Sequence, residues 1–281
     1  MFTLPQLVPL SFSLLATLSW GISDFVGGYG SRRTNPFLLT TFTHVGGATL
    51  MLLLAWLTHA TTPTRSAVAW SIAAGVSGGI SLAIFYKALS MGSMGLIAPV
   101  AALIGAAIPT LAGIYAEGVP GAVPIAGFVL AGIGIWLISR HEGDQGRPAG
   151  LGLAALSGIG FAGFFLFIKQ AGDVSALWAA GVSRLASLLA TGTIVLATRQ
   201  LRPLTRAGIL LGLFAGVVDS TGSALFVRAS QTGRLDAAVV ISSLYPAVTV
   251  LLARFLLEEH FSRWKLAGLV AAVLAVPMIS C

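Results

Sequence analysis

Charged residues and cysteines are scarce in this chain of 281 residues. Only 9% of its residues are charged, whereas an average soluble domain carries about 25%, so the surface of a water-soluble globule could not be covered. The single cysteine, Cys281, excludes a disulfide framework and a thiolate metal site. The chain also lacks a glycine-rich phosphate loop followed by Lys and Ser or Thr, the usual nucleotide-binding signal.

Apolar residues make up 56% of the chain and fall into runs close to the roughly 20 residues that an α-helix needs to cross a bilayer. The first run has no basic segment before it, so it predicts an uncleaved helix rather than a signal peptide. The sequence predicts an all-α integral membrane protein with ten transmembrane helices, at residues 7–28, 36–57, 68–90, 95–116, 121–139, 150–171, 175–197, 207–229, 235–256 and 264–280. The polar breaks between them are too short for a further domain.

The charge balance is basic, with 16 Lys and Arg against nine Asp and Glu, a net charge of +7. The arginines stand singly or in pairs between apolar runs, a pattern typical of loops that face anionic lipid headgroups. We therefore expect the lipid bilayer as a partner and no nucleic acid.

An internal repeat appears when the chain is shifted by 141 positions. Two matched charges are its strongest signal: Lys87 falls on Arg228, and Glu117 falls on Glu258. Further matches place Ala74-Gly75-Val76 on Ala215-Gly216-Val217, Phe85 on Phe226, Gly92 on Gly233, Ala126-Gly127 on Ala267-Gly268 and Trp20 on Phe161. The predicted units are residues 1–140 and 150–281, with five helices each. Because five is odd, two successive copies lie in opposite orientations across the bilayer, a recurring plan of secondary transporters.

These residues also resemble a known family, the drug/metabolite transporter superfamily and specifically its EamA-domain ten-helix exporters. The motifs that carry the resemblance are Trp20-Gly21, Ser23-Asp24-Phe25, Tyr86-Lys87-Ala88-Leu89, Ala98-Pro99, Glu117 and Ala126-Gly127, with Arg228-Ala229, Glu258-Glu259 and Ala267-Gly268 in the second half. The resemblance implies gradient-driven or proton-coupled movement of amino acids, nucleotide derivatives, sugars or cationic drugs. It also implies a multi-pass protein of the plasma membrane, the inner membrane of a bacterium.

Four ionisable residues lie deep in predicted spans, where a charge costs about 2.5–3.5 kcal/mol on insertion scales. Asp219 is a candidate proton acceptor or partner for a substrate ammonium, or else forms a structural ion pair with Arg184. Arg184 is a candidate ligand for a carboxylate, or only the partner in that pair. His44 titrates near neutral pH or is a hydrogen-bonded packing residue. Asp24 takes part in transport or pairs locally with Arg32 or Arg33.

Aromatic and proline residues complete the candidate site. Trp20, Tyr86 and Tyr245, together with Phe161, are candidates to line a cavity for an apolar or aromatic substrate. Pro109 and Pro246 are candidate hinges, because each is expected to interrupt its helix. Gly105 holds the position equivalent to Pro246.

The orientation of the chain stays open at this stage. Alternating the loops places four Lys and Arg on the side of the termini and eleven on the other side, so the positive-inside rule puts both termini outside. The family resemblance puts them inside.

We expect a secondary active transporter of a small organic solute, a metabolite such as an amino acid or a drug-like cation, working by alternating access and in the direction of export. Protons are the candidate coupling ion. The alternatives are a multidrug exporter of lipophilic cations, and a membrane enzyme or lipid-handling scaffold. We expect no enzyme activity, cofactor or metal, because the sequence contains no nucleophile–base set and no ligand cluster. A monomer and a homodimer both stay open.

Overall fold

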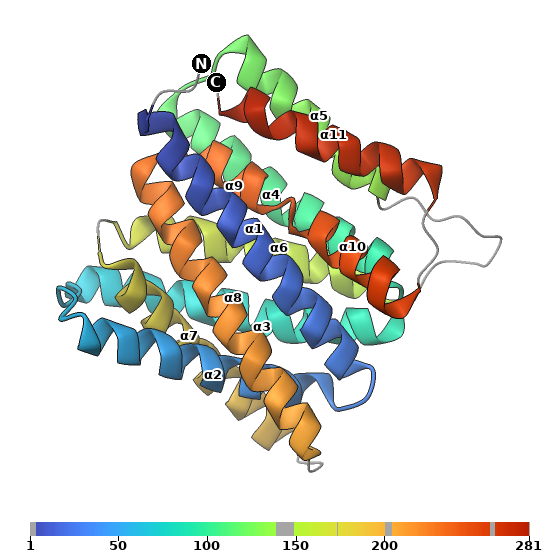
Figure 1. The fold of residues 1–281 in the computed structure, drawn as a ribbon. Coiled ribbons are helices and arrows are strands. Elements are labelled where there is room, and N and C mark those ends of the chain that lie inside the picture. The colour runs from blue at the N-terminus through green and yellow to red at the C-terminus, as the bar shows by residue number, and fades with distance from the viewer. Residues whose placement is uncertain (1–3, 139–148, 173, 200–203, 259–261, 281) are drawn as a thin grey trace.

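A computed structural model describes residues 4–138, 149–172, 174–199, 204–258 and 262–280. Within these residues the regular elements are eleven helices, and there is no strand. They are α1 (Leu4–Ser31), α2 (Pro36–Leu57), α3 (Arg65–Met91), α4 (Met94–Glu117), α5 (Ala122–Ile138), α6 (Leu151–Gln170), α7 (Ala176–Ala197), α8 (Arg206–Thr232), α9 (Leu235–Ser242), α10 (Tyr245–Leu257) and α11 (Arg263–Ile279), as drawn in Figure 1. The predicted all-helical class is confirmed.

Eight segments are long and apolar enough to cross a membrane, and α5 is a shorter apolar helix. One of the eight is the combined segment Leu235–Leu257, which holds α9 and α10. Both α5 and α11 have 17 residues, and at about 1.5 Å per residue such a helix falls short of a hydrocarbon core of about 30 Å. The prediction of an integral multi-pass protein is confirmed. Of the ten predicted spans, eight are supported by length and hydropathy in the described residues.

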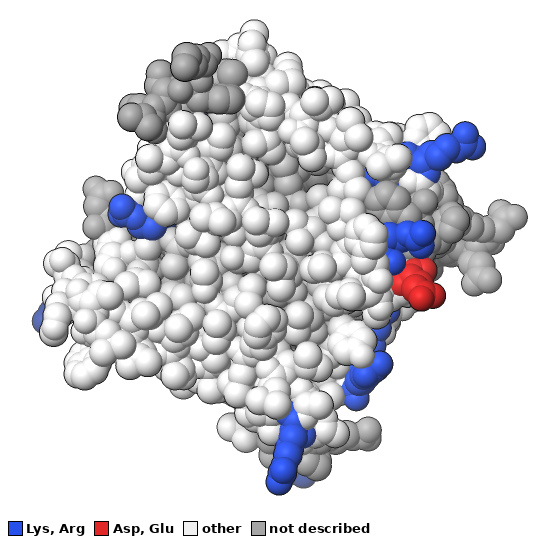
Figure 2. All heavy atoms as spheres, in the orientation of Figure 1, with Lys and Arg blue, Asp and Glu red and all other residues white. Residues whose placement is uncertain are grey.

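The surface suits a lipid environment. Large apolar side chains point outward from several helices, for example Leu111 (67% exposed), Leu189 (65%) and Val273 (70%). Figure 2 shows a broad uncharged surface, with Lys and Arg gathered mainly along the edges away from the two termini. A protein in water would not leave such an apolar band open, so the band marks the part in contact with acyl chains.

The predicted ninth helix is broken, as its proline suggested. The chain leaves helical geometry at Ser243 and Leu244, between α9 and α10. Pro246 has no N–H to donate to the carbonyl group of Ser242, and the serines before it compete for backbone hydrogen bonds. The local sequence therefore ends one helix and starts another.

Pro109 does not have the same effect, and the expected interruption there is wrong. Helix α4 continues through both Pro99 and Pro109. The residues that precede Pro109 include Ala106 and Ala107, the best helix formers, in place of the two serines before Pro246.

Helix contacts repeat when the two halves are exchanged. With α1–α5 matched to α6, α7, α8, α9/α10 and α11, the packing of α1 on α8 corresponds to that of α6 on α3, and α2 on α8 corresponds to α7 on α3. Helix α4 packs on α6 as α10 packs on α1. Helices α2 and α7 contact each other, as do α5 and α11, which lie side by side at one edge in Figure 1. The halves thus interleave around a shared centre.

Two matched glycines permit the closest of these approaches. A Cβ on Gly75 would collide with the carbonyl oxygen of Ser183, and a Cβ on Gly216 would collide with that of Thr43. Each glycine lets α3 or α8 lie against the backbone of α7 or α2, a packing mode common in membrane helices.

Candidate functional site

A cavity lies at the shared centre, where the two halves meet. Both halves contribute to its wall, through α1, α3 and α4 on one side and α6, α7, α8 and α10 on the other. The lining residues are Trp20, Asp24, Gly78, Leu82, Ala101, Ala102, Gly105, Phe161, Phe164, Phe165, Arg184, Asp219, Ser243 and Tyr245. The structure therefore brings together three of the four predicted ionisable residues and three of the four predicted aromatic ones.

Arg184 and Asp219 form a buried ion pair across α7 and α8. Arg184 Nη1 lies 2.8 Å from Asp219 Oδ2, and each side chain is only 7% exposed. Arg184 Nη2 donates a hydrogen bond of 2.5 Å to the hydroxyl of Ser223, which in turn donates to the backbone carbonyl of Asp219. Of the two arrangements considered for these residues, the structure shows the ion pair, and both terminal nitrogens of the arginine are occupied.

Asp24 supplies the second carboxylate of the cavity lining. It is 5% exposed, and within the described part of the chain its side chain has no hydrogen bond and no ion pair. The local pairing considered from the sequence is not formed: Arg33 lies over the ring of Tyr29, 4.3 Å from its centroid, and Arg32 donates to the carbonyl of Gly92. Asp24 instead lies within electrostatic range of a second carboxylate in the cavity, that of Asp219, and like charges repel.

His44 lies outside the cavity lining, on α2. Its side chain is fully buried, and neither ring nitrogen makes a well-aligned hydrogen bond to any described residue. It lies within electrostatic reach of Arg184. Its ring also lies close to the backbone of Gly79 on α3, and both roles considered for it, packing and binding, stay predictions.

Tyr86 also lies outside the lining of the cavity. Its fully buried ring packs against Phe85 and over Gly27, whose missing side chain makes room for it. Its hydroxyl donates a long hydrogen bond, 3.5 Å, to the carbonyl of Ser23. Tyr86 therefore fixes the end of α1 that holds Asp24 rather than facing the cavity.

Aromatic rings form the apolar wall, with Trp20 at their centre. Its ring lies 5.7 Å from that of Phe165, 6.4 Å from Phe164 and 6.5 Å from Tyr245, measured between centroids. Its indole N–H donates to the backbone carbonyl of Asp219, 3.2 Å away. The tryptophan thereby connects the apolar wall to the ion pair.

Sequence reasoning missed Phe164, Phe165, Ser243 and Gly78 as parts of the wall. The signal for three of them was in the repeat: Phe165 holds the position of Asp24, Gly78 that of Asp219, and Ser243 that of Ala102. A residue at one wall position has its counterpart on the opposite wall, because the cavity lies where the halves meet.

Ser243 and Tyr245 bring polar groups to the wall at the helix break. The hydroxyl oxygens of both are buried without a hydrogen-bond partner in the described chain, and the residues are 1% and 6% exposed. The phenol group of Tyr245 lies within electrostatic range of the Asp24 carboxylate. A discontinuous helix at a polar cavity is the local structure that many transporters use for binding.

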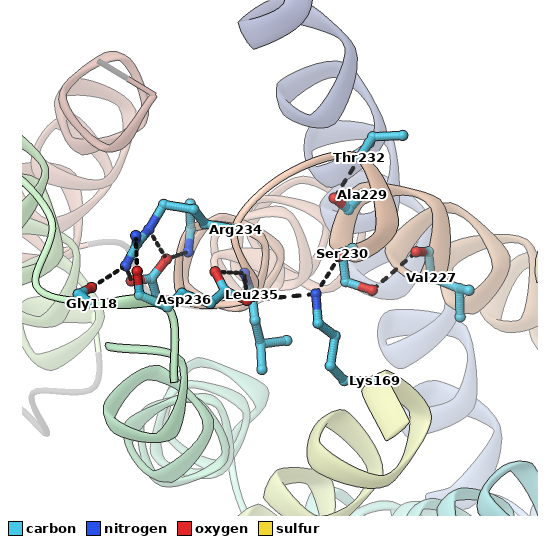
Figure 3. Close-up of polar contacts among 11 residues, drawn as sticks. Gly118, Lys169, Val227, Ala229, Ser230, Thr232, Arg234, Leu235 and Asp236 are labelled. Atoms are coloured by element: carbon cyan, nitrogen blue, oxygen red, sulfur yellow. Dashed lines mark hydrogen bonds and ion pairs between the residues drawn. The ribbon is translucent and has the colours of Figure 1, made fainter. Parts of the chain in front are cut away.

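A second polar cluster ties helix ends together on the side of the chain termini (Figure 3). Glu117, at the end of α4, accepts the backbone N–H of Leu235 at the start of α9, and its carboxylate lies 3.5 Å from Lys169 Nζ on α6. Lys169 also donates to the carbonyl of Ser230 on α8, 2.7 Å away. We call these residues, together with Arg234, the terminal-side cluster.

Arg234 completes the terminal-side cluster. Its guanidinium donates to the carbonyls of Glu117 and Gly118 and pairs with Asp236, with 2.7 Å between Nη2 and Oδ2. The hydrogen bond with Asp236 is the main cause that raises the pKa of Arg234 above its ordinary value. The arginine thus stays charged while it joins the end of α4 to the start of α9.

The model of the EamA-like transporter family matches the chain twice, at residues 8–140 and 148–281. The chain belongs to the EamA-like transporter family. The family predicted from the motifs is thereby confirmed, and with it a membrane protein built from two repeats.

A solved structure has the same fold as this EamA protein. A crystal structure of another protein, 16% identical in sequence, superposes with a TM-score of 0.75 over 99% of this chain and 98% of that one. No curated protein matches the chain. The EamA membership is consistent with a transporter of small solutes.

Proposed function

We propose that this EamA protein is a secondary active transporter that moves a small organic solute by alternating access through the central cavity. The observation that carries the proposal is the cavity itself: both halves build it, a helix breaks at its wall, and three buried ionisable side chains meet there. Ionisable groups at this depth are costly, and they mark substrate or ion pathways in membrane proteins.

We further propose ten membrane crossings in two oppositely oriented units. The matched helix contacts support this arrangement, because exchanging the halves reproduces the same neighbours. An inverted pair of units has two equivalent ways of closing around one site, which is the basis of alternating access. A bacterial inner membrane is the proposed location.

Asp24 supports coupling to protons and movement out of the cell. A buried carboxylate without a partner is neutralised by a proton or by a cation. On one side of the membrane a solute binds Asp24 and displaces the proton, and on the other side a proton displaces the solute. The two are thereby exchanged, so an inward proton gradient drives export of the solute. The candidate solutes are metabolites such as amino acids and drug-like cations.

A transport assay in proteoliposomes tests the proposal. Purified protein is reconstituted with a trapped pH indicator, a pH gradient is imposed, and amino acids, amines, nucleosides and sugars are added in turn. We expect at least one solute to cause proton flux in the wild type and at least tenfold less flux in Asp24→Asn. The matched control is Glu258→Gln, which alters an exposed carboxylate at the end of α10. Folded protein that moves no solute under any gradient would contradict the proposal.

A further inference from the structure

The charges that line the cavity do not balance. Two carboxylates, Asp24 and Asp219, face one guanidinium, that of Arg184. The guanidinium pairs with Asp219 through Nη1 and donates to Ser223 through Nη2, while its Nε has no hydrogen-bond partner among the described residues. The cavity therefore holds one carboxylate, that of Asp24, with no cation in the lining to balance it.

From this imbalance we infer, on the basis of the proposed function, that the substrate is a monovalent organic amine with an aromatic or apolar body and without a carboxylate. Asp24 binds its ammonium group, and the rings around Trp20 enclose its body. An ammonium group has three N–H donors. Asp24 and the two unpartnered hydroxyl oxygens, Ser243 Oγ and Tyr245 Oη, line the same cavity as acceptors for them.

The aromatic wall favours the same ligand. Trp20, Phe161, Phe164, Phe165 and Tyr245 surround the cavity, and ring faces attract cations, most strongly when water is excluded. A ligand with one aromatic ring and a short ammonium arm satisfies both the walls and Asp24.

An amino acid fits this cavity less well than the matching amine. Its carboxylate would enter beside two carboxylates, where like charges repel. Placed on the unpartnered Nε of Arg184, it would bring a third carboxylate to one guanidinium and one ammonium group, so the excess negative charge of the cavity would remain. The same reasoning disfavours an organic anion more strongly, because an anion has no ammonium group to place on Asp24.

A charge series on one ring tests the inference. Tyramine, tyrosine and 3-(4-hydroxyphenyl)propionate share a phenol ring and carry, near neutral pH, one positive charge, both charges and one negative charge. Binding is measured by isothermal titration calorimetry on the full protein in lipid nanodiscs. We expect tyramine to bind with a Kd at least tenfold below that of tyrosine, and the propionate not to bind.

Two variants locate the ammonium site. Asp24→Asn is expected to raise the Kd for tyramine at least tenfold, Ser243→Ala to raise it severalfold, and Glu258→Gln to leave it unchanged. The comparison of three ligands on the wild type needs no variant, so the test holds even where a substitution impairs folding. Tyrosine or the propionate binding as tightly as tyramine, an unchanged Kd in Asp24→Asn, or no binding of tyramine to folded protein would each overturn the inference.

Failure of this inference and failure of the proposed function give different results. Solutes that cross proteoliposomes while tyramine does not bind would overturn the amine assignment and leave the transporter standing. Tyramine bound through Asp24, with no solute moved under any gradient, would support the amine site and remove the transport function.

Discussion

At the scale of single residues, matched positions in the two halves carry different chemistry. Asp219 stands where the first half has Gly78, Arg184 where it has Thr43, and Asp24 opposite Phe165. The helical framework is repeated in the two halves, whereas the charged residues of the cavity are not. Glycine at position 78 also leaves the space in which the cavity forms, because a side chain there would approach Phe164.

The ion pair predicts a large cost for removing one partner. Asp219→Asn leaves the guanidinium of Arg184 buried without its counter-ion, and breaking such a pair costs about 3–5 kcal/mol. We expect a lower free energy of unfolding, measured by titration with denaturing detergent from mixed micelles. The double variant Asp219→Asn with Arg184→Gln is expected to be more stable than Asp219→Asn alone. Equal stability of wild type and Asp219→Asn would contradict a structural role for the pair.

The sequence predicted the depth of these residues but not the direction of their side chains. Asp24, Arg184, Asp219, Trp20 and Tyr245 line the cavity, whereas His44 and Tyr86 lie outside its lining. Position along an apolar run gives the height in the membrane. The face that a residue presents depends on how the helix is rotated against its neighbours, and these apolar runs carry little amphipathic signal to fix that rotation.

At the scale of helices, close packing depends on matched glycines. We predict that Gly216→Ala lowers stability by about 1–3 kcal/mol, because its Cβ would overlap the backbone of α2 and packed cores resist such insertions. Gly192→Ala is the control: its Cβ would meet no atom within 4 Å. Detergent unfolding curves for the two variants give the comparison. A Gly216→Ala protein as stable as the control would show that α8 and α2 do not rely on this contact.

Among the described residues, the terminal-side cluster has no matching cluster on the opposite side. Glu258 repeats Glu117, but the positions that match Lys169, Arg234 and Asp236 are Gly28, Ser93 and Gly95. The sequence showed the paired glutamates and gave no reason to expect that only one would be bonded. The terminal-side cluster favours the conformation in which α4, α6, α8 and α9 are joined there.

We predict that Glu117→Gln loosens the start of α9. The variant replaces a charged acceptor of the Leu235 N–H with a neutral one and removes the pair with Lys169. Amide hydrogen exchange in α9 is expected to become about tenfold faster, which corresponds to roughly 1.4 kcal/mol, a reasonable value for a charge-assisted hydrogen bond. Exchange is followed by mass spectrometry, with Glu258→Gln as the matched control. Unchanged exchange in Glu117→Gln would rule out this role for the carboxylate.

At the scale of the whole molecule, composition and the repeat were enough to predict a two-repeat helical membrane protein. They did not determine how many helices span the bilayer. The repeat predicts α5 and α11 as spans, yet each has 17 residues, and α11 begins with Arg263 and Lys265. Short helices of this kind cross a bilayer only with local thinning or with polar ends reaching the headgroups, which length and hydropathy cannot decide.

The distribution of charge predicts the orientation in the membrane. On the side of the termini, the Lys and Arg residues are Arg65, Lys169, Arg228 and Arg234. The opposite side carries Arg32, Arg33, Lys87, Arg199, Arg206, Arg254, Arg263 and Lys265, while Arg140, Arg147 and Arg202 lie outside the described residues. By the positive-inside rule the basic side faces the cytoplasm and both termini lie outside.

The single cysteine allows a direct test of that orientation. Cys281 in intact spheroplasts is treated with a membrane-impermeant maleimide, and labelling is compared with that after lysis. We expect full labelling before lysis, because the C-terminus is predicted to lie outside. The control is Cys281→Ser combined with Arg33→Cys, which moves the thiol to the end of α1 on the basic side and should label only after lysis. The reverse pattern would place the termini inside, as the family resemblance implied, and would show that this chain inserts against its own loop charges.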